Sequence, residues 1–141
     1  MRPVERAARA ADSCIARFGG KAFDPASNRD CVKLAAHCLH AQGIGTPKLK
    51  GLRYRTVEGA ARHMKRMGFN DLVQAVDDLG IEAIPLARAL PGFIIAIPTD
   101  NGLFGPAALG ICLNHREAFG FFGGIAQSVI VHDHIKAWRT F

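Results

Sequence analysis

The sequence lacks the features typical of membrane proteins, of secreted proteins and of small domains stabilised by disulfides or zinc. Its longest uncharged apolar run, Leu90 to Thr99, contains two prolines and falls well short of the roughly 18–20 residues that a membrane helix needs. The first twenty residues carry charges among alanines and no apolar core, so we expect no secretory signal. The four cysteines form no CxxC pair, which argues against a disulfide framework and a zinc ribbon.

The composition that is present predicts a single globular domain over residues 1–141, because 49% of the chain is hydrophobic and 21% is charged. Charge is uneven: residues 1–70 hold 14 Lys or Arg and 5 Asp or Glu, whereas residues 71–141 hold 4 and 7. Much of the excess lies in a basic segment, made up of Lys48, Lys50, Arg53, Arg55, Arg62, Lys65 and Arg66. Such a surface suits phosphates, anionic lipid or an acidic protein. Tyr54 is the one aromatic residue among these bases, and no nucleic-acid motif accompanies them, which argues against nucleic acid.

Hydrophobic periodicity divides the chain into a helical part and a strand part. Apolar residues recur at helical spacing over residues 4–18, 31–39, 57–67 and 72–79, with Ser27 or Asn28 as the expected cap of the second helix and Asn70 as that of the fourth. Strands are predicted over 93–97, 107–113, 117–122 and 125–131, with a turn at 100–102 and a short C-terminal helix over 132–138. This order predicts an α+β domain: an N-terminal helix (1–20) and a helical half (21–91) packed on an antiparallel sheet of about four strands (92–141).

Cys31 is the residue with the clearest chemical potential. With Asn28 as cap, it lies in the first turn of the second helix, where unpaired N–H groups and the helix dipole favour a thiolate. A thiol nucleophile also needs a general base. His37 and His40 lie about 240° and 180° around the same helix, so the base would have to come from the sheet. A buried structural cysteine is the alternative.

A wider pattern resembles known proteins. The helix-initiating Asp30-Cys31 and the later Leu109-Gly110-Ile111 look like the NlpC-type cysteine peptidases, a papain-like superfamily of murein endopeptidases. The whole layout, over roughly residues 18–141, resembles a small family encoded in phage and prophage tail-gene clusters. The pieces that carry this resemblance are residues 23–31, Tyr54-Arg55-Thr56, Gly59 to Arg62, Gly105 to Cys112 and Ala137-Trp138-Arg139.

The resemblance implies Cys31 as the nucleophile but supplies no base. It equates Ala108 with the catalytic histidine of NlpC-type enzymes, and a methyl group cannot accept a proton. The third polar residue should lie near Phe119 and Gly120, where nothing polar stands. His115, in the adjacent turn, is the remaining candidate base.

The histidine-rich stretches do not predict a metal site. In His37-Cys38-Leu39-His40 the cysteine faces the core and the histidines face away, and His132-Asp133-His134 has no visible third ligand. The cysteines are too scattered for an iron–sulfur cluster, so we expect no metal and no cofactor.

The resemblance and the missing base together predict a non-catalytic, peptidase-like domain that is a structural part of a phage tail tip. It would reside in the virion and, during assembly, in the host cytoplasm. Its expected partners are other tail-tip and hub proteins, contacted through the basic segment and an exposed end with Trp138 and Phe141. The alternative is an active murein endopeptidase that acts on peptidoglycan through Cys31. A third hypothesis is a small binder of nucleic acid or of a tape protein.

Overall fold

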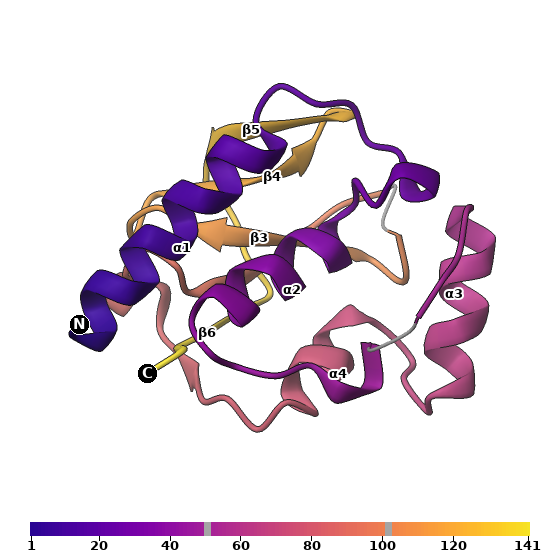
Figure 1. The fold of residues 1–141 in the computed structure, drawn as a ribbon, viewed down its shortest axis with the longest axis horizontal. Helices are drawn as coiled ribbons and strands as arrows, with labels where there is room; N and C mark the ends of the chain where they lie inside the picture. Colours follow the sequence, from indigo (N-terminus) through magenta and orange to yellow (C-terminus); the bar gives the residue numbers. More distant parts are fainter. Residues whose placement is uncertain (50–51, 101–102) are drawn as a thin grey trace.

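The structure is a computed structural model that describes residues 1–49, 52–100 and 103–141. Within these ranges, four α-helices come first and a six-stranded antiparallel sheet follows, so the predicted α+β class is confirmed (Figure 1). α1 and α2 pack against each other, α2 also packs against the sheet, and α3 stands at one side of the molecule (Figure 1). Lys50 and most of the expected turn at 100–102 lie outside the described residues.

The helices follow the apolar periodicity of the sequence. They are α1 (Pro3–Phe18), α2 (Cys31–Ala41), α3 (Val57–Arg66) and α4 (Leu72–Asp77), with short 3-10 turns η1 (Pro25–Ser27), η2 (Pro47–Leu49) and η3 (Leu86–Arg88). The expected caps of α2 and α4 are wrong: Asp30 and Asp71 cap these helices. Asn28 has φ 60° and closes η1, so its backbone cannot adopt the extended conformation of an N-cap.

The sheet contains the four predicted strands and two more. Its strands are β1 (Ala83–Ile84), β2 (Ile94–Pro98), β3 (Ala107–Cys112), β4 (Glu117–Phe122), β5 (Ile125–Ile130) and β6 (Lys136–Trp138), in the spatial order β1-β6-β2-β3-β4-β5. The helix predicted over 132–138 is wrong, because residues 136–138 form β6. β6 pairs with β2 on one side and β1 on the other, so the last strand of the chain lies inside the sheet.

Alternating side chains give the sheet two faces with different partners. The main core lies between the helices and one face, to which β2, β3 and β4 contribute Ile94, Ala96, Ala107, Leu109, Ile111, Phe119 and Phe121. The opposite face carries a smaller cluster that includes Phe93, Ile95, Cys112, Ala118 and Ala137. All four cysteines are buried and free, and Cys38 faces the main core as predicted.

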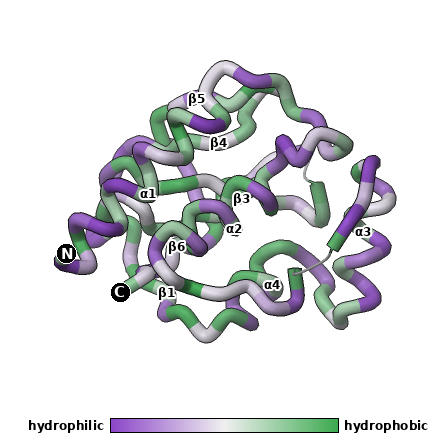
Figure 2. The backbone as a smooth tube through the Cα atoms, in the orientation of Figure 1, coloured by the Kyte–Doolittle hydropathy of each residue, from purple (hydrophilic) through white to green (hydrophobic). Residues whose placement is uncertain are grey.

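The helices differ in how much of their surface meets water. α3 is drawn mainly in the purple of hydrophilic residues and buries only its Gly59, Ala60 and Met64 side, whereas α2 is buried along most of its length (Figure 2). None of the helices in the described part of the chain combines the length and the hydropathy that a membrane crossing requires.

Candidate functional site

The turn η1 and the helix cap Asp30 position Cys31 at the start of α2. The carboxylate of Asp24 accepts a hydrogen bond from the backbone N–H of Ala26 at 3.2 Å, and this holds η1 in place. After the left-handed residue Asn28, the Asp30 carboxylate accepts a hydrogen bond from the backbone N–H of Lys33 at 3.0 Å. Cys31 follows as the first residue of α2, so its expected place in the first helical turn is confirmed.

The surroundings of Cys31 keep its thiol protonated. Its side chain is only 3% exposed. Burial raises the pKa of the thiol to about 12, backbone hydrogen bonding by Leu109 opposes this shift only in part, and the charge of Asp30 adds to it. Because the thiolate is the reactive form of cysteine, this burial disfavours nucleophilic attack by Cys31 at neutral pH.

The strand that packs against Cys31 offers no general base. Leu109 and Ile111 belong to the face of β3 that packs on α2, and the core residues that β2 and β4 contribute to that face, Ile94, Ala96, Phe119 and Phe121, are apolar. Glu117 shares this face by alternation, but it lies at the first position of β4, where its carboxylate accepts a hydrogen bond of 3.4 Å from the side chain of Asn114. Ala108 belongs by alternation to the opposite face. The position that the resemblance equates with the catalytic histidine therefore points away from Cys31, since one residue of register reverses the face of a strand.

His115 does not come close to Cys31 either. It lies in the exposed turn between β3 and β4, beyond the end of β3 at Cys112. Cys31 meets β3 at Leu109. At roughly 3.3 Å per residue, the strand alone separates this contact from the turn by about 10 Å. The structure thus does not assemble the nucleophile and base considered from the sequence.

A polar pair that the sequence analysis missed lies beside the start of α2. The hydroxyl of Tyr54 donates a hydrogen bond of 2.8 Å to the carboxylate of Asp30, which is fully buried. The ammonium group of Lys33 lies 5.3 Å from the centre of the Tyr54 ring. Burial, followed by the neighbouring charge of Asp30, raises the pKa of Tyr54, so the phenol acts as a donor. The two residues are 24 positions apart, and no local spacing indicates the pair.

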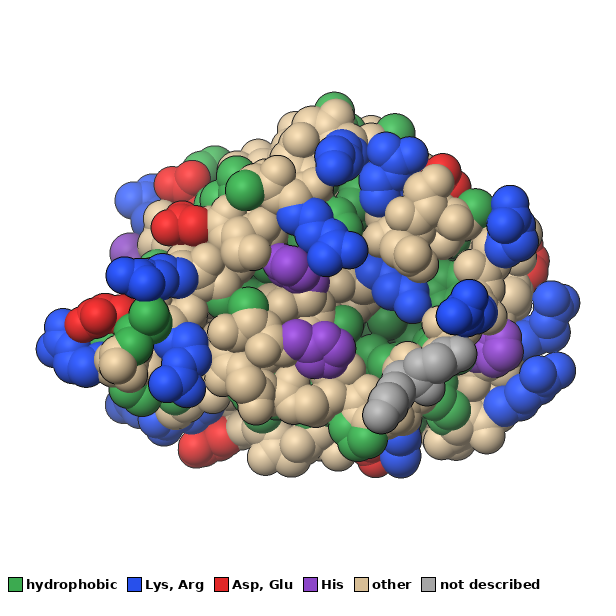
Figure 3. Space-filling model, viewed as in Figure 1, with side chains coloured by type: hydrophobic (Ala, Val, Ile, Leu, Met, Phe, Trp, Pro, Cys, Tyr) green, Lys and Arg blue, Asp and Glu red, His purple; other side chains and the backbone are tan. Residues whose placement is uncertain are grey.

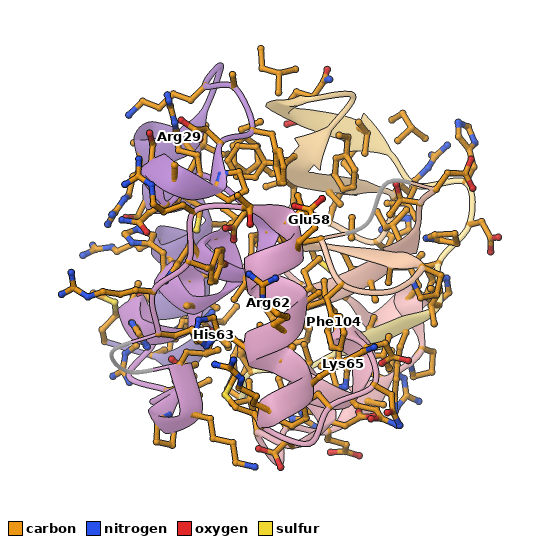
Figure 4. All side chains as sticks on the ribbon, turned by 90° about the vertical axis from the view of Figure 1, so that its right-hand side faces the viewer. Arg29, Glu58, Arg62, His63, Lys65 and Phe104 are labelled. Atoms are coloured by element: carbon orange, nitrogen blue, oxygen red, sulfur yellow. The ribbon has the colours of Figure 1, made fainter. Side chains whose placement is uncertain are left out.

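The basic segment divides into parts with different surroundings. Arg53 and Arg55 are exposed and line a cleft of about 1040 Å³, which lies between α2 and residues 45–49 and 52–55. Lys48 instead forms an ion pair of 3.0 Å with Asp78. Arg62 belongs to α3, on the side of the molecule that faces the viewer in Figure 4, and does not line the cleft.

Trp138 is not the exposed anchor expected from the sequence. Its side chain is fully buried, and its indole N–H donates a hydrogen bond of 2.8 Å to the carboxylate of Asp77. The reason is the interior position of β6, which places Trp138 opposite Ile94 of β2. Phe141 is 37% exposed, and its ring packs edge-on against Phe93 at 5.2 Å.

The histidines of α2 have hydrogen-bond partners of their own. His37 shares a hydrogen bond of 2.8 Å with the Ser13 hydroxyl, and His40 shares one of 2.6 Å with the Thr46 hydroxyl. Among residues 1–49, 52–100 and 103–141, no three His, Cys, Asp or Glu side chains gather as a metal site.

Comparison with known protein families identifies the family to which this chain belongs. One family model matches residues 3–140, nearly the whole chain. The chain belongs to DUF6950, a domain of unknown function. No curated protein and no solved structure matches this DUF6950 chain. What a DUF6950 domain does must therefore be inferred from the residues described above.

Proposed function

We propose that this DUF6950 chain is a non-catalytic, peptidase-like domain that acts by binding, as a structural protein of a phage tail tip. The proposal rests on the Cys31 thiol, which is buried, protonated and packed on an apolar sheet face. A cysteine hydrolase needs a thiolate with a base within hydrogen-bond reach. The resemblance to proteins encoded in phage tail-gene clusters is the reason for naming the tail tip as the assembly and the virion as its location.

The start of α2 supports a structural role for the residues that resemble a catalytic motif. Asp30 caps the helix and accepts the Tyr54 hydrogen bond, and Cys31 fills the space between α2 and β3. In an enzyme, these groups would face a substrate; here they face protein atoms. The partners we propose are other tail-tip and hub proteins, met in the host cytoplasm during assembly and retained in the virion.

An active murein endopeptidase is the competing proposal, and one observation favours it. Cys31 is the first residue of α2, and backbone hydrogen bonding by Leu109, Cys31 and Val32 lowers the pKa of the thiol. Burial outweighs this effect, which is why the binding role is the one proposed.

The two proposals differ in what they require of the Cys31 sulfur. The variant Cys31→Ala removes the sulfur, and Cys38→Ala removes a second buried cysteine of the same helix as a matched control. We expect phage that carry either variant to assemble tails containing the chain at a fixed copy number and to infect at wild-type titre. We also expect the purified chain to leave peptidoglycan intact.

Two results would overturn the assembly role. One is the absence of the chain from purified mature tails. The other is peptidoglycan hydrolysis by the wild-type chain that Cys31→Ala abolishes and Cys38→Ala retains, which would establish the endopeptidase.

A further inference from the structure

We infer that the cleft between α2 and residues 45–49 and 52–55 binds an extended acidic segment of a partner protein. Six basic side chains line this cleft: Arg17 from α1, Lys33, His37 and His40 from α2, and Arg53 and Arg55 from the opposite wall. No Asp or Glu of the described residues lines it. Figure 3 shows this face, with blue Lys and Arg side chains around the hollow, histidine surface within it, and acidic side chains toward the edges of the molecule.

The cations of the cleft have no carboxylate partner among the described residues, although the ammonium group of Lys33 donates a hydrogen bond of 3.2 Å to the backbone carbonyl of Leu52. Elsewhere in the described chain, basic side chains form ion pairs with carboxylates, as Lys48 does with Asp78 and Lys136 with Asp77. Arg17, Lys33, Arg53 and Arg55 form no such pair with a described residue. Cations that converge on one concavity without carboxylates create a positive potential that attracts anions.

The positions of these cations suit a ligand longer than a single anion. Arg17 lies at the end of α1, where its guanidinium is 3.2 Å from the ring nitrogen of His37. Arg53 and Arg55 stand on the other wall, formed by the segment that the Tyr54–Asp30 hydrogen bond ties to α2. A volume of about 1040 Å³ slightly exceeds the roughly 300–1,000 Å³ that small-molecule sites occupy. An extended peptide can place carboxylates against both walls at once.

The remaining lining favours a peptide over nucleic acid or lipid. Val32, Ala36 and Leu52 line the same cleft and can accept apolar side chains of a peptide. Single-stranded nucleic acid binds mainly where bases stack on available aromatic rings. The two aromatic residues of the lining are already engaged: Phe18 is buried against Phe121, and Tyr54 carries Lys33 over its ring. A concave site also cannot lie flat on a membrane surface.

This inference rests on the proposed assembly role for the origin of the segment, a neighbouring tail protein, but the binding itself can be measured on the isolated chain. The probe is a fluorescein-labelled peptide in which glutamates alternate with leucines, and its binding is followed by fluorescence polarisation at low and high salt. The reference probes are the same peptide with glutamine in place of glutamate, a single-stranded oligodeoxynucleotide, and phosphatidylglycerol vesicles.

A charge-matched pair of variants locates the binding. The variant Arg53→Glu with Arg55→Glu reverses one wall of the cleft, and Arg88→Glu with Arg116→Glu reverses two exposed arginines outside it. Both variants change the net charge equally. We expect the cleft variant to weaken binding of the acidic peptide about tenfold or more, the control variant to weaken it about threefold or less, and added salt to weaken wild-type binding.

Three results would overturn the inference: no binding of the acidic peptide, equal loss in the two variants, or tighter binding of the oligonucleotide or the vesicles than of the peptide. Failure of peptide binding would leave the copy number of the chain in tails unchanged. Absence from tails would leave peptide binding unchanged, so the two proposals fail separately.

Discussion

The hydroxyl of Tyr54 donates a 2.8 Å hydrogen bond to the buried carboxylate of Asp30, the residue that caps α2. One oxygen of Asp30 thus holds the first turn of the helix and the other holds the chain segment that forms a wall of the basic cleft. Burial raises the pKa of Asp30, and the hydrogen bonds from Lys33 and Tyr54 oppose that shift. A single carboxylate therefore couples the start of α2 to the cleft.

Replacing Asp30 separates its hydrogen bonds from its charge. Asp30→Ala removes the cap and leaves the Tyr54 hydroxyl without its acceptor, so we expect the free energy of unfolding to fall by about 2–4 kcal/mol. Asp30→Asn removes the buried charge but keeps only one acceptor oxygen, and its amide nitrogen then faces the other donor, so it should cost an intermediate amount, about 1–2 kcal/mol. Urea denaturation measures both values.

Asp71→Ala serves as the control for capping alone. Asp71 caps α4 by accepting a hydrogen bond from the backbone N–H of Gln74, and its loss should cost about 1 kcal/mol. Equal losses for Asp30→Ala and Asp30→Asn would show that the charge, and not the pair of hydrogen bonds, stabilises the site.

Gly92 provides a test of how closely α1 approaches the sheet. Its φ is +93°, and a Cβ atom at this position would overlap the backbone carbonyl of Ala7 in α1. We expect Gly92→Ala to lower the free energy of unfolding by about 2–5 kcal/mol, through the left-handed backbone and the displacement of α1. Gly80 has a similar φ of +79° with nothing within 4 Å, so Gly80→Ala should cost only about 1 kcal/mol. Thermal and urea unfolding that found equal costs would contradict this packing.

Trp138 is the only tryptophan of the chain and reports on the interior position of β6. We expect its fluorescence in the folded protein to be blue-shifted and weakly quenched by acrylamide, and to move to longer wavelength on unfolding. Trp138→Phe removes the hydrogen bond to Asp77 and should cost about 1–2 kcal/mol, whereas Trp138→Ala also opens a cavity and should cost about 3–5 kcal/mol. If the native protein emitted at the wavelength of the unfolded chain, Trp138 would be exposed to solvent, and its position inside the sheet would be wrong.

The elements predicted correctly from the sequence are those whose signal is local. Helical spacing and glycine ends indicate α1 to α4, and short apolar runs between turns indicate β2 to β5. β6 was missed because three residues, Lys136 to Trp138, carry no periodicity. Their conformation is decided by pairing with β1 and β2, which lie about 40 to 55 residues earlier in the chain.

The candidate site was predicted in part for the same reason. Cys31 at a helix start follows from its neighbours in sequence. The face of β3 that meets it does not, because the choice between Ala108 and Leu109 depends on how the strand packs. The Tyr54–Asp30 hydrogen bond depends on the path of the chain between them, which local spacing does not encode.

The buried thiols predict a loss of stability at alkaline pH. Burial raises the pKa values of Cys31 and Cys112 from 9.0 to about 12 in the folded protein. Both groups are protonated in either state below pH 9, so their contribution to stability is complete there. Above pH 9 the unfolded chain loses these protons first, and the free energy of unfolding falls until the pH reaches about 12, by about 1.4 kcal/mol per pH unit for each thiol.

Urea titrations at a series of pH values, with reductant present, measure this slope. Cys31→Ala and Cys112→Ala should each make the slope shallower by one thiol. Val32→Ala, which removes a neighbouring buried group that does not titrate, should lower the whole curve without changing its slope. A slope that Cys31→Ala leaves unchanged would mean that the Cys31 thiol is as free to ionise in the folded protein as in the unfolded chain, and the non-catalytic role proposed for it would lose its support.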